Sequence, residues 1–177
     1  MDLLVRARHA DDLPVLVELL SAQQAGSSYP IRWPLPIPTV DFLVRPTERR
    51  AWVAESAGAV VGHVTVAHVD EPLVPLFAPA LGSAPMGMIS VLFTAEAWRG
   101  LGVGGTLLDT AVAWIRVQGE VPVLDVVPTH DTALTIYQRR GWVEVGRARF
   151  VWLPGNLPEV LLMALPPYQP NAASVDS

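Results

Sequence analysis

Apolar and polar residues follow one another along this chain with two different periods, and the two kinds of segment alternate from end to end. Runs of alternating or continuous apolar residues predict β-strands, and apolar residues spaced three and four apart predict helices. The predicted strands span residues 3–8, 51–55, 60–68, 88–94, 121–127, 142–152 and 157–165. The predicted helices span residues 11–23, 106–118 and 131–140, with one helical turn at 39–44. The resulting order, β-α-(α)-β-β-β-α-β-α-β-β, is that of an α/β protein.

Two proline-rich segments interrupt this pattern. Residues 26–46 contain five prolines together with Tyr29 and Trp33, and aromatic side chains on such a loop either cover the core or wall a substrate pocket. Residues 70–87 contain four more prolines and are predicted to be a connection without regular structure. Long connections of this kind often bind ligands, so we interpret 70–87 as a candidate substrate or dimer element.

The composition indicates one globular domain. A chain of 177 residues with 51% apolar residues can bury a substantial core, so we expect residues 1–165 to form a single domain and residues 166–177 a disordered tail. The net charge is −5 with only 12 Lys and Arg, which argues against a nucleic-acid partner. The absence of Cys excludes thiolate catalysis and disulfides. The first residues resemble neither a signal peptide nor a membrane span, which predicts a cytoplasmic protein without a membrane partner.

A glycine-rich turn from Arg99 to Thr106, with the sequence RGLGVGGT, joins the predicted strand at 88–94 to the next helix. Glycines remove side chains from the turn and allow backbone N–H groups to approach a ligand closely. The helix that begins there directs its unpaired N–H groups and the positive end of its dipole at the turn. The turn is therefore predicted to bind a phosphate or pyrophosphate, with Arg99 adding a positive charge.

Three interpretations of this turn compete. A nucleoside-triphosphatase loop requires a Lys that the turn lacks. The dinucleotide pattern Gly-x-Gly-x-x-Gly is present at Gly100, Gly102 and Gly105, with Asp125 about twenty residues later. Against it, five residues separate the strand from the first glycine, whereas a dinucleotide turn follows its strand almost directly. The third pattern is Arg-x-x-Gly-x-Gly at Arg99, Gly102 and Gly104.

This third pattern resembles the coenzyme A loop of the GCN5-related N-acetyltransferase (GNAT) superfamily. A second motif, Ala133-x-x-x-Tyr137-x-x-x-Gly141-Trp142, looks like the superfamily's Asn-x-x-Ala-x-x-x-Tyr-x-x-x-Gly-Phe. His130 stands where the superfamily often has Asn. The element order is similar to the superfamily's fold over residues 3–165, and implies a mixed, mostly antiparallel sheet of six to seven strands flanked by helices.

The resemblance implies an acetyl-CoA-dependent N-acetyltransferase that acts on a primary amine of a small molecule or peptide, without a covalent enzyme intermediate. It implies Tyr137 as general acid toward sulfur. The cofactor-binding residues that it implies are Leu92, Phe93, Thr94, Arg99, Gly100, Leu101, Gly102, Val103, Gly104, Gly105 and Thr106. A homodimer is common among similar proteins. A noncatalytic acyl-CoA-binding sensor and an NAD(P)-dependent oxidoreductase are the alternative functions.

The general base is less well defined by the sequence. The candidates are Glu55, His68, Asp125 and His130. Asp125 is our candidate base, because a charge within an apolar strand is costly unless it reaches solvent, a partner or a cleft. Tyr29, Trp33, His68 and His130 are candidate substrate contacts. His63 and His68 are an odd number of residues apart on one predicted strand, so they face opposite sides and we expect no metal site.

Overall fold

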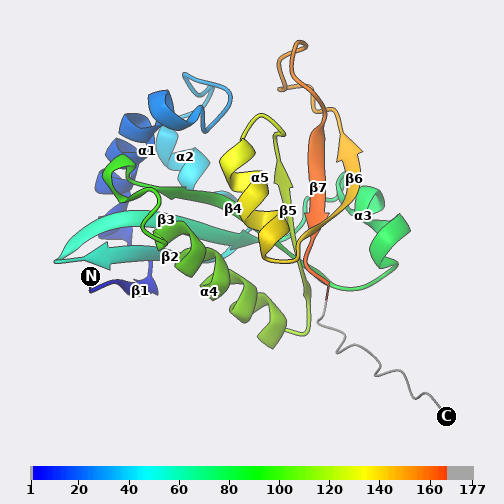
Figure 1. The fold of residues 1–177 in the computed structure, drawn as a ribbon, viewed down its shortest axis with the longest axis horizontal. Helices are drawn as coiled ribbons and strands as arrows, with labels where there is room; N and C mark the ends of the chain where they lie inside the picture. The colour runs from blue at the N-terminus through cyan, green and yellow to red at the C-terminus, as the bar shows by residue number, and fades with distance from the viewer. Residues whose placement is uncertain (1, 167–177) are drawn as a thin grey trace.

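A seven-stranded sheet forms the centre of the computed structural model, which describes residues 2–166 (Figure 1). The strand order is β1-β2-β3-β4-β5-β7-β6. Strands β4 and β5 are parallel, and all other neighbours are antiparallel. The strands are β1 (Leu4–Ala7), β2 (Glu48–Ser56), β3 (Ala59–Ala67), β4 (Met86–Thr94), β5 (Val121–Val126), β6 (Val143–Ala148) and β7 (Val160–Ala164). This confirms the predicted mixed, mostly antiparallel sheet.

Within residues 2–166, five α-helices cover the two faces of this sheet, and two short 3-10 helices lie at Ala10–Asp12 and Glu96–Trp98. The α-helices are α1 (Leu13–Ser27), α2 (Thr39–Leu43), α3 (Val74–Leu81), α4 (Val103–Val117) and α5 (Asp131–Arg139). Neighbouring residues of a strand point to opposite faces, and β2 shows how this divides the core. Trp52 belongs to the cluster that packs against α4, whereas Val53 packs with Leu16 and Leu20 of α1.

Strands β4 and β5 pair only over a short length. Their register joins Met86 to Val121, Gly87 to Pro122 and Met88 to Val123, and the strands diverge beyond these residues (Figure 1). On its other side, β4 contains an irregularity opposite β3, where Val91 has a φ of 49°. A β-branched residue in this region of backbone space is uncommon. A β-bulge of this kind bends and twists its strand, so it accounts for the divergence of β4 from β5.

The segment 70–87 differs from its prediction. It was expected to lack regular structure, but it contains α3, which lies beside β6. Pro75 stands in the first turn of the helix, where a missing N–H costs no hydrogen bond. Phe77 is fully buried against the sheet, and this packing compensates for Pro79 inside the helix.

Several predicted boundaries also move. The strand expected at 142–152 ends at Ala148, and the strand expected at 157–165 begins at Val160. The predicted disordered tail lies outside the described residues except for Pro166. Within residues 2–166, no helix is both long enough and apolar enough to cross a membrane.

Candidate active site

The glycine-rich turn leads directly into α4. Gly100 and Gly102 have φ values of 75° and 86°, a conformation that favours glycine. Gly102 is the N-cap residue of α4, and no side chain caps the helix there. The first backbone hydrogen bond of the helix runs from the Thr106 N–H to the Gly102 carbonyl, at 3.0 Å. The three preceding N–H groups, those of residues 103–105, are therefore placed to bind an anion.

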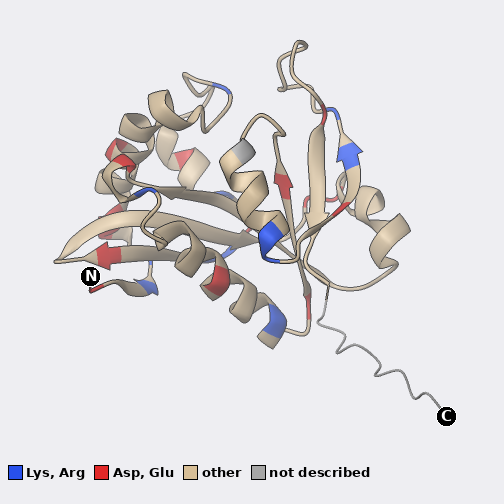
Figure 2. Cartoon of the chain, viewed as in Figure 1, with Lys and Arg blue, Asp and Glu red and all other residues tan. Residues whose placement is uncertain are grey.

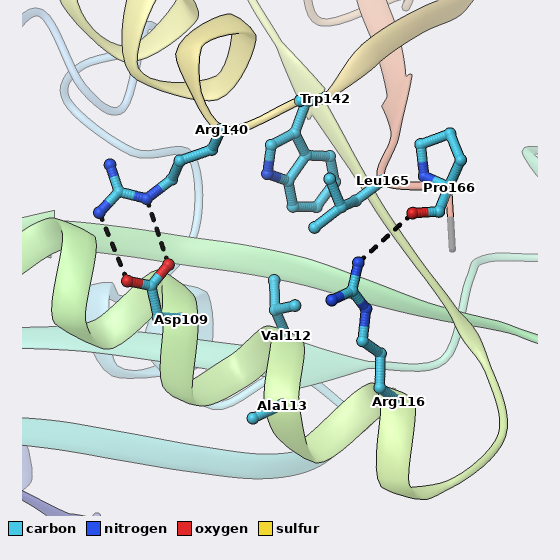
Figure 3. A pocket seen from close by; sticks show the side chains of 9 residues that line it. Asp109, Val112, Ala113, Arg116, Arg140, Trp142, Leu165 and Pro166 are labelled. Carbon is cyan, nitrogen blue, oxygen red and sulfur yellow. Dashed lines mark hydrogen bonds and ion pairs between the residues drawn. The ribbon is translucent and has the colours of Figure 1, made fainter. Parts of the chain in front are cut away.

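Two arginines flank this turn, and each is held by a different element. The Arg99 guanidinium donates to the carbonyl and the side-chain oxygen of Gln23 on α1, at 2.8 and 3.0 Å. Arg140, just after α5, pairs with Asp109 of α4 at 3.2 Å and lies directly over Gly105. Figure 3 shows this ion pair at one end of a pocket of about 570 Å³ beside α4. The sequence did not single out Arg140.

The end of β4 lies against the start of α4. A side-chain carbon added at Gly104 would come within 3.6 Å of the Thr94 methyl group. Phe93 is 5% exposed, whereas Leu92 and Thr94 are half-buried. The bulge thus brings the backbone of residues 92–94 beside the anion-binding turn.

A buried histidine supports the bulge. His63 is completely buried, and its Nδ1 lies 2.9 Å from the Val91 carbonyl while its Nε2 lies 3.1 Å from the Arg8 guanidinium. Because Arg8 can only donate, Nε2 accepts and Nδ1–H donates to Val91. Burial, reinforced by the charge of Arg8, lowers the pKa of His63 to about 4. The side chain is therefore neutral at pH 7 and acts as a fixed brace for β4.

Tyr137, Tyr29 and Asp125 lie near one another where β4 and β5 diverge. Each is half-buried. Burial, with the nearby Tyr29 and Asp125, raises the pKa of Tyr137, so its phenol keeps its proton at neutral pH. Burial likewise raises the pKa of Tyr29 to about 12. The ring of His130 lies 6.2 Å from that of Tyr29, and its Nε2 is 3.3 Å from the Ser28 carbonyl.

A cavity of about 260 Å³ brings Asp125 together with His68, two of the predicted residues. Burial raises the pKa of Asp125, and the charge of Arg45 partly opposes this shift. Asp125 is the acidic residue of β5, which has the sequence VPVLDV, and Figure 2 shows a red segment within this strand. Arg45 and Ser90 also line the cavity, and sequence reasoning missed both because neither belongs to a motif.

The other predicted site residues lie elsewhere. Glu55 pairs with Arg6 on β1 at 2.8 Å and does not line the cavity. Trp33 is 37% exposed and is also absent from the lining. Within the described part of the chain, no group of three or more His, Asp or Glu side chains is arranged to hold a metal ion.

Residues 16–142 match the model of the acetyltransferase (GNAT) family. The chain belongs to this family. Among solved structures, this GNAT protein is similar to a histone acetyltransferase HPA2-related acetyltransferase from Corynebacterium glutamicum, with 25% identity, a TM-score of 0.68, and coverage of 97% of this chain and 99% of that one. A ribosomal-protein-alanine N-acetyltransferase from Brucella melitensis is 21% identical, with a TM-score of 0.68 and coverage of 91% and 98%.

A third similar structure is a spermidine N-acetyltransferase from Vibrio cholerae in complex with CoA and spermine. It is 19% identical to the GNAT chain, with a TM-score of 0.67 and coverage of 92% and 94%. A search of the curated proteins found no significant match.

The described residues fit coenzyme A. The cofactor's pyrophosphate requires backbone donors and space, and the uncapped start of α4 offers the donors. A side-chain carbon added at Gly102 would have no neighbour within 4 Å, so the space beside the turn is open. The diverging part of β4 offers backbone groups, between residues 89 and 94, that do not pair with β5.

Proposed function

We propose that this GNAT protein is an acetyl-CoA-dependent N-acetyltransferase that transfers acetyl directly to a primary amine of a small molecule or peptide. One observation carries the proposal: an uncapped, glycine-lined helix start lies beside a bulged strand that diverges from its parallel neighbour. This arrangement offers donors for a pyrophosphate and, next to them, free backbone groups for an extended thioester arm.

The cofactor-binding roles divide between two elements. The N–H groups of residues 103–105 bind the pyrophosphate, and the backbone of Leu92, Phe93 and Thr94 holds the thioester arm. Arg99 contributes positive charge from its place against Gln23, and Leu101, which is 53% exposed, lies within the turn. By fixing the cofactor in this way, the protein turns transfer into an effectively unimolecular step.

The chemistry needs a neutral amine and a protonated leaving group. Bound acetyl-CoA supplies a thioester whose carbonyl carbon bonds to the amine nitrogen as its carbon–sulfur bond breaks. Asp125 accepts the proton that the amine loses, and its raised pKa makes it a better base than an ordinary carboxylate. Tyr137 donates its phenol proton to the departing sulfur. Since a thiol has a pKa of about 8.5, the thiolate already leaves readily, so this donation contributes modestly.

The first experiment separates cofactor binding from turnover. Calorimetric titrations with acetyl-CoA and with NAD(P)H should show binding of acetyl-CoA and no binding of NAD(P)H. Incubation of the protein with acetyl-CoA and a panel of amines should release CoA with at least one of the amines. Binding of NAD(P)H without acetyl-CoA would refute the proposal. Binding of acetyl-CoA without release of CoA on any amine would indicate a sensor. The cytoplasmic location and the homodimer stay predictions.

The second experiment tests the residue roles. Tyr137→Phe should lower kcat while leaving the affinity for acetyl-CoA unchanged. Tyr29→Phe is the matched control, because it removes the hydroxyl of a neighbouring tyrosine. An unaltered kcat in Tyr137→Phe would remove it as the general acid. Arg99→Ala should weaken acetyl-CoA binding, and an unaltered dissociation constant would count against its role at the pyrophosphate.

A further inference from the structure

The cavity beside Asp125 contains opposite charges that do not neutralise each other. Arg45 and Asp125 both line it. They are close enough for Arg45 to lower the pKa of Asp125, yet they form no ion pair within residues 2–166. A positive and a negative group therefore face the same space at a distance.

The Arg45 guanidinium is held in place but retains free donors. Its carbon atom lies 4.8 Å from the centre of the Phe42 ring, and its Nε makes a long hydrogen bond of 3.4 Å to the Phe42 carbonyl. Among the described residues, its two terminal nitrogens have no hydrogen-bond partner. A guanidinium presented in this way is suited to a bidentate bond with a carboxylate.

Two further features of the cavity point to a small polar ligand. The Ser90 hydroxyl is buried and has no hydrogen-bond partner in the described part of the chain, although Ser90 lines the cavity. Phe150 and Trp152 form one wall, with their rings stacked at 5.1 Å and 7°. The volume of about 260 Å³ lies just below the range of about 300–1,000 Å³ typical of pockets for drug-sized ligands.

We propose that the acceptor is an amino acid or a similar small compound that carries a carboxylate besides its primary amine. The inference rests on the proposed function. Asp125 receives the amine, Arg45 binds the carboxylate, and the Ser90 hydroxyl completes the polar contacts. Asp70, at the same cavity, adds a second negative charge that attracts an amine as it approaches.

The test compares each of the common amino acids with its carboxamide and its decarboxylated amine, and includes spermidine. At least one amino acid should have a KM about tenfold or more below that of its carboxamide, as expected for a charge-assisted hydrogen-bond pair. Arg45→Gln should remove this preference, measured as the ratio of the KM of the carboxamide to that of the amino acid. Arg50→Gln, an exposed arginine over Trp52 and outside the cavity, is the matched control and should keep it.

Binding gives a second readout that does not need turnover. Calorimetric titration of the same amino acid and carboxamide into the CoA-saturated protein should show the same Arg45-dependent discrimination. Arg45→Glu should reverse it and favour an amine with a second cationic group, which a merely structural role of Arg45 would not produce.

The outcomes separate the two proposals. Turnover of spermidine, a peptide or simple amines, without any preference for carboxylates, would overturn this inference and leave the acetyltransferase intact. Arg45-dependent binding of an amino acid without release of CoA would support the carboxylate-binding site, but it would refute the catalytic function and with it the role of the amino acid as acceptor. If no amino acid shows Arg45-dependent binding and no amine gives release of CoA, both the acceptor inference and the acetyltransferase function are refuted.

Discussion

Lowering the pH from about 7.5 to 5 should decrease the free energy of unfolding by about 2 kcal/mol through His63 alone. Burial lowers the pKa of this side chain from 6.5 to about 4. Between these two pH values the unfolded chain binds a proton on His63 and the folded chain does not, so stability is lost as the pH falls through 6.5 toward 4. The whole shift is worth about 3 kcal/mol, of which about 2 kcal/mol is lost by pH 5.

Denaturant unfolding at the two pH values measures this loss. The wild-type protein and His63→Gln are compared by the change in unfolding free energy between the pH values, so any constant destabilisation of the variant cancels. The variant should lose about 2 kcal/mol less than the wild type. His68→Gln is the matched control, because His68 is exposed and contacts neither Arg8 nor Val91. An equal loss of unfolding free energy in the wild type and in His63→Gln would refute the assignment of His63 as a neutral side chain in the folded protein.

Three further predictions concern the site and the core. Asp125→Asn should abolish the acidic limb of the pH–rate profile, which should lie above the ordinary carboxyl range because burial raises the pKa of Asp125; a retained limb would exclude Asp125 as the base. Gly102→Ala should weaken acetyl-CoA binding, whereas Gly82→Ala, also at positive φ with open space around it, should destabilise the fold without changing the dissociation constant. Phe77→Ala should reduce the unfolding free energy by about 3–5 kcal/mol, and a loss below about 1 kcal/mol would mean that α3 is not docked on the sheet.

The sequence predicted most of the fold because its periodic patterns are long. The apolar stripe of α4 and the continuous apolar strand β4 are both local patterns, and the turn between them carries its own glycine signal. The helix α3 was missed because its two prolines suggest a break. What stabilises it is the burial of Phe77 against a distant part of the sheet, which no local pattern records.

The site was predictable to the extent that motifs describe it. The glycine turn and Tyr137 belong to recognised motifs, and Asp125 was noticeable as a charge within an apolar strand. Arg45, Ser90 and the His63 brace were not identified, because their importance comes from partners far away in the sequence. His63, for example, contacts Arg8, which lies 55 positions earlier in the sequence, and Val91, which lies 28 positions later.

The short pairing of β4 with β5 divides the sheet into two plates, β1–β4 and β5–β7–β6, that share only three residue pairs. One of these pairs includes Pro122, which has no N–H to donate. A molecule that fits between the diverging strands would connect the plates as well as bind to them. Binding of this molecule would then also make the sheet more rigid. A mutation far from the site that loosens either plate would therefore weaken binding without touching the ligand.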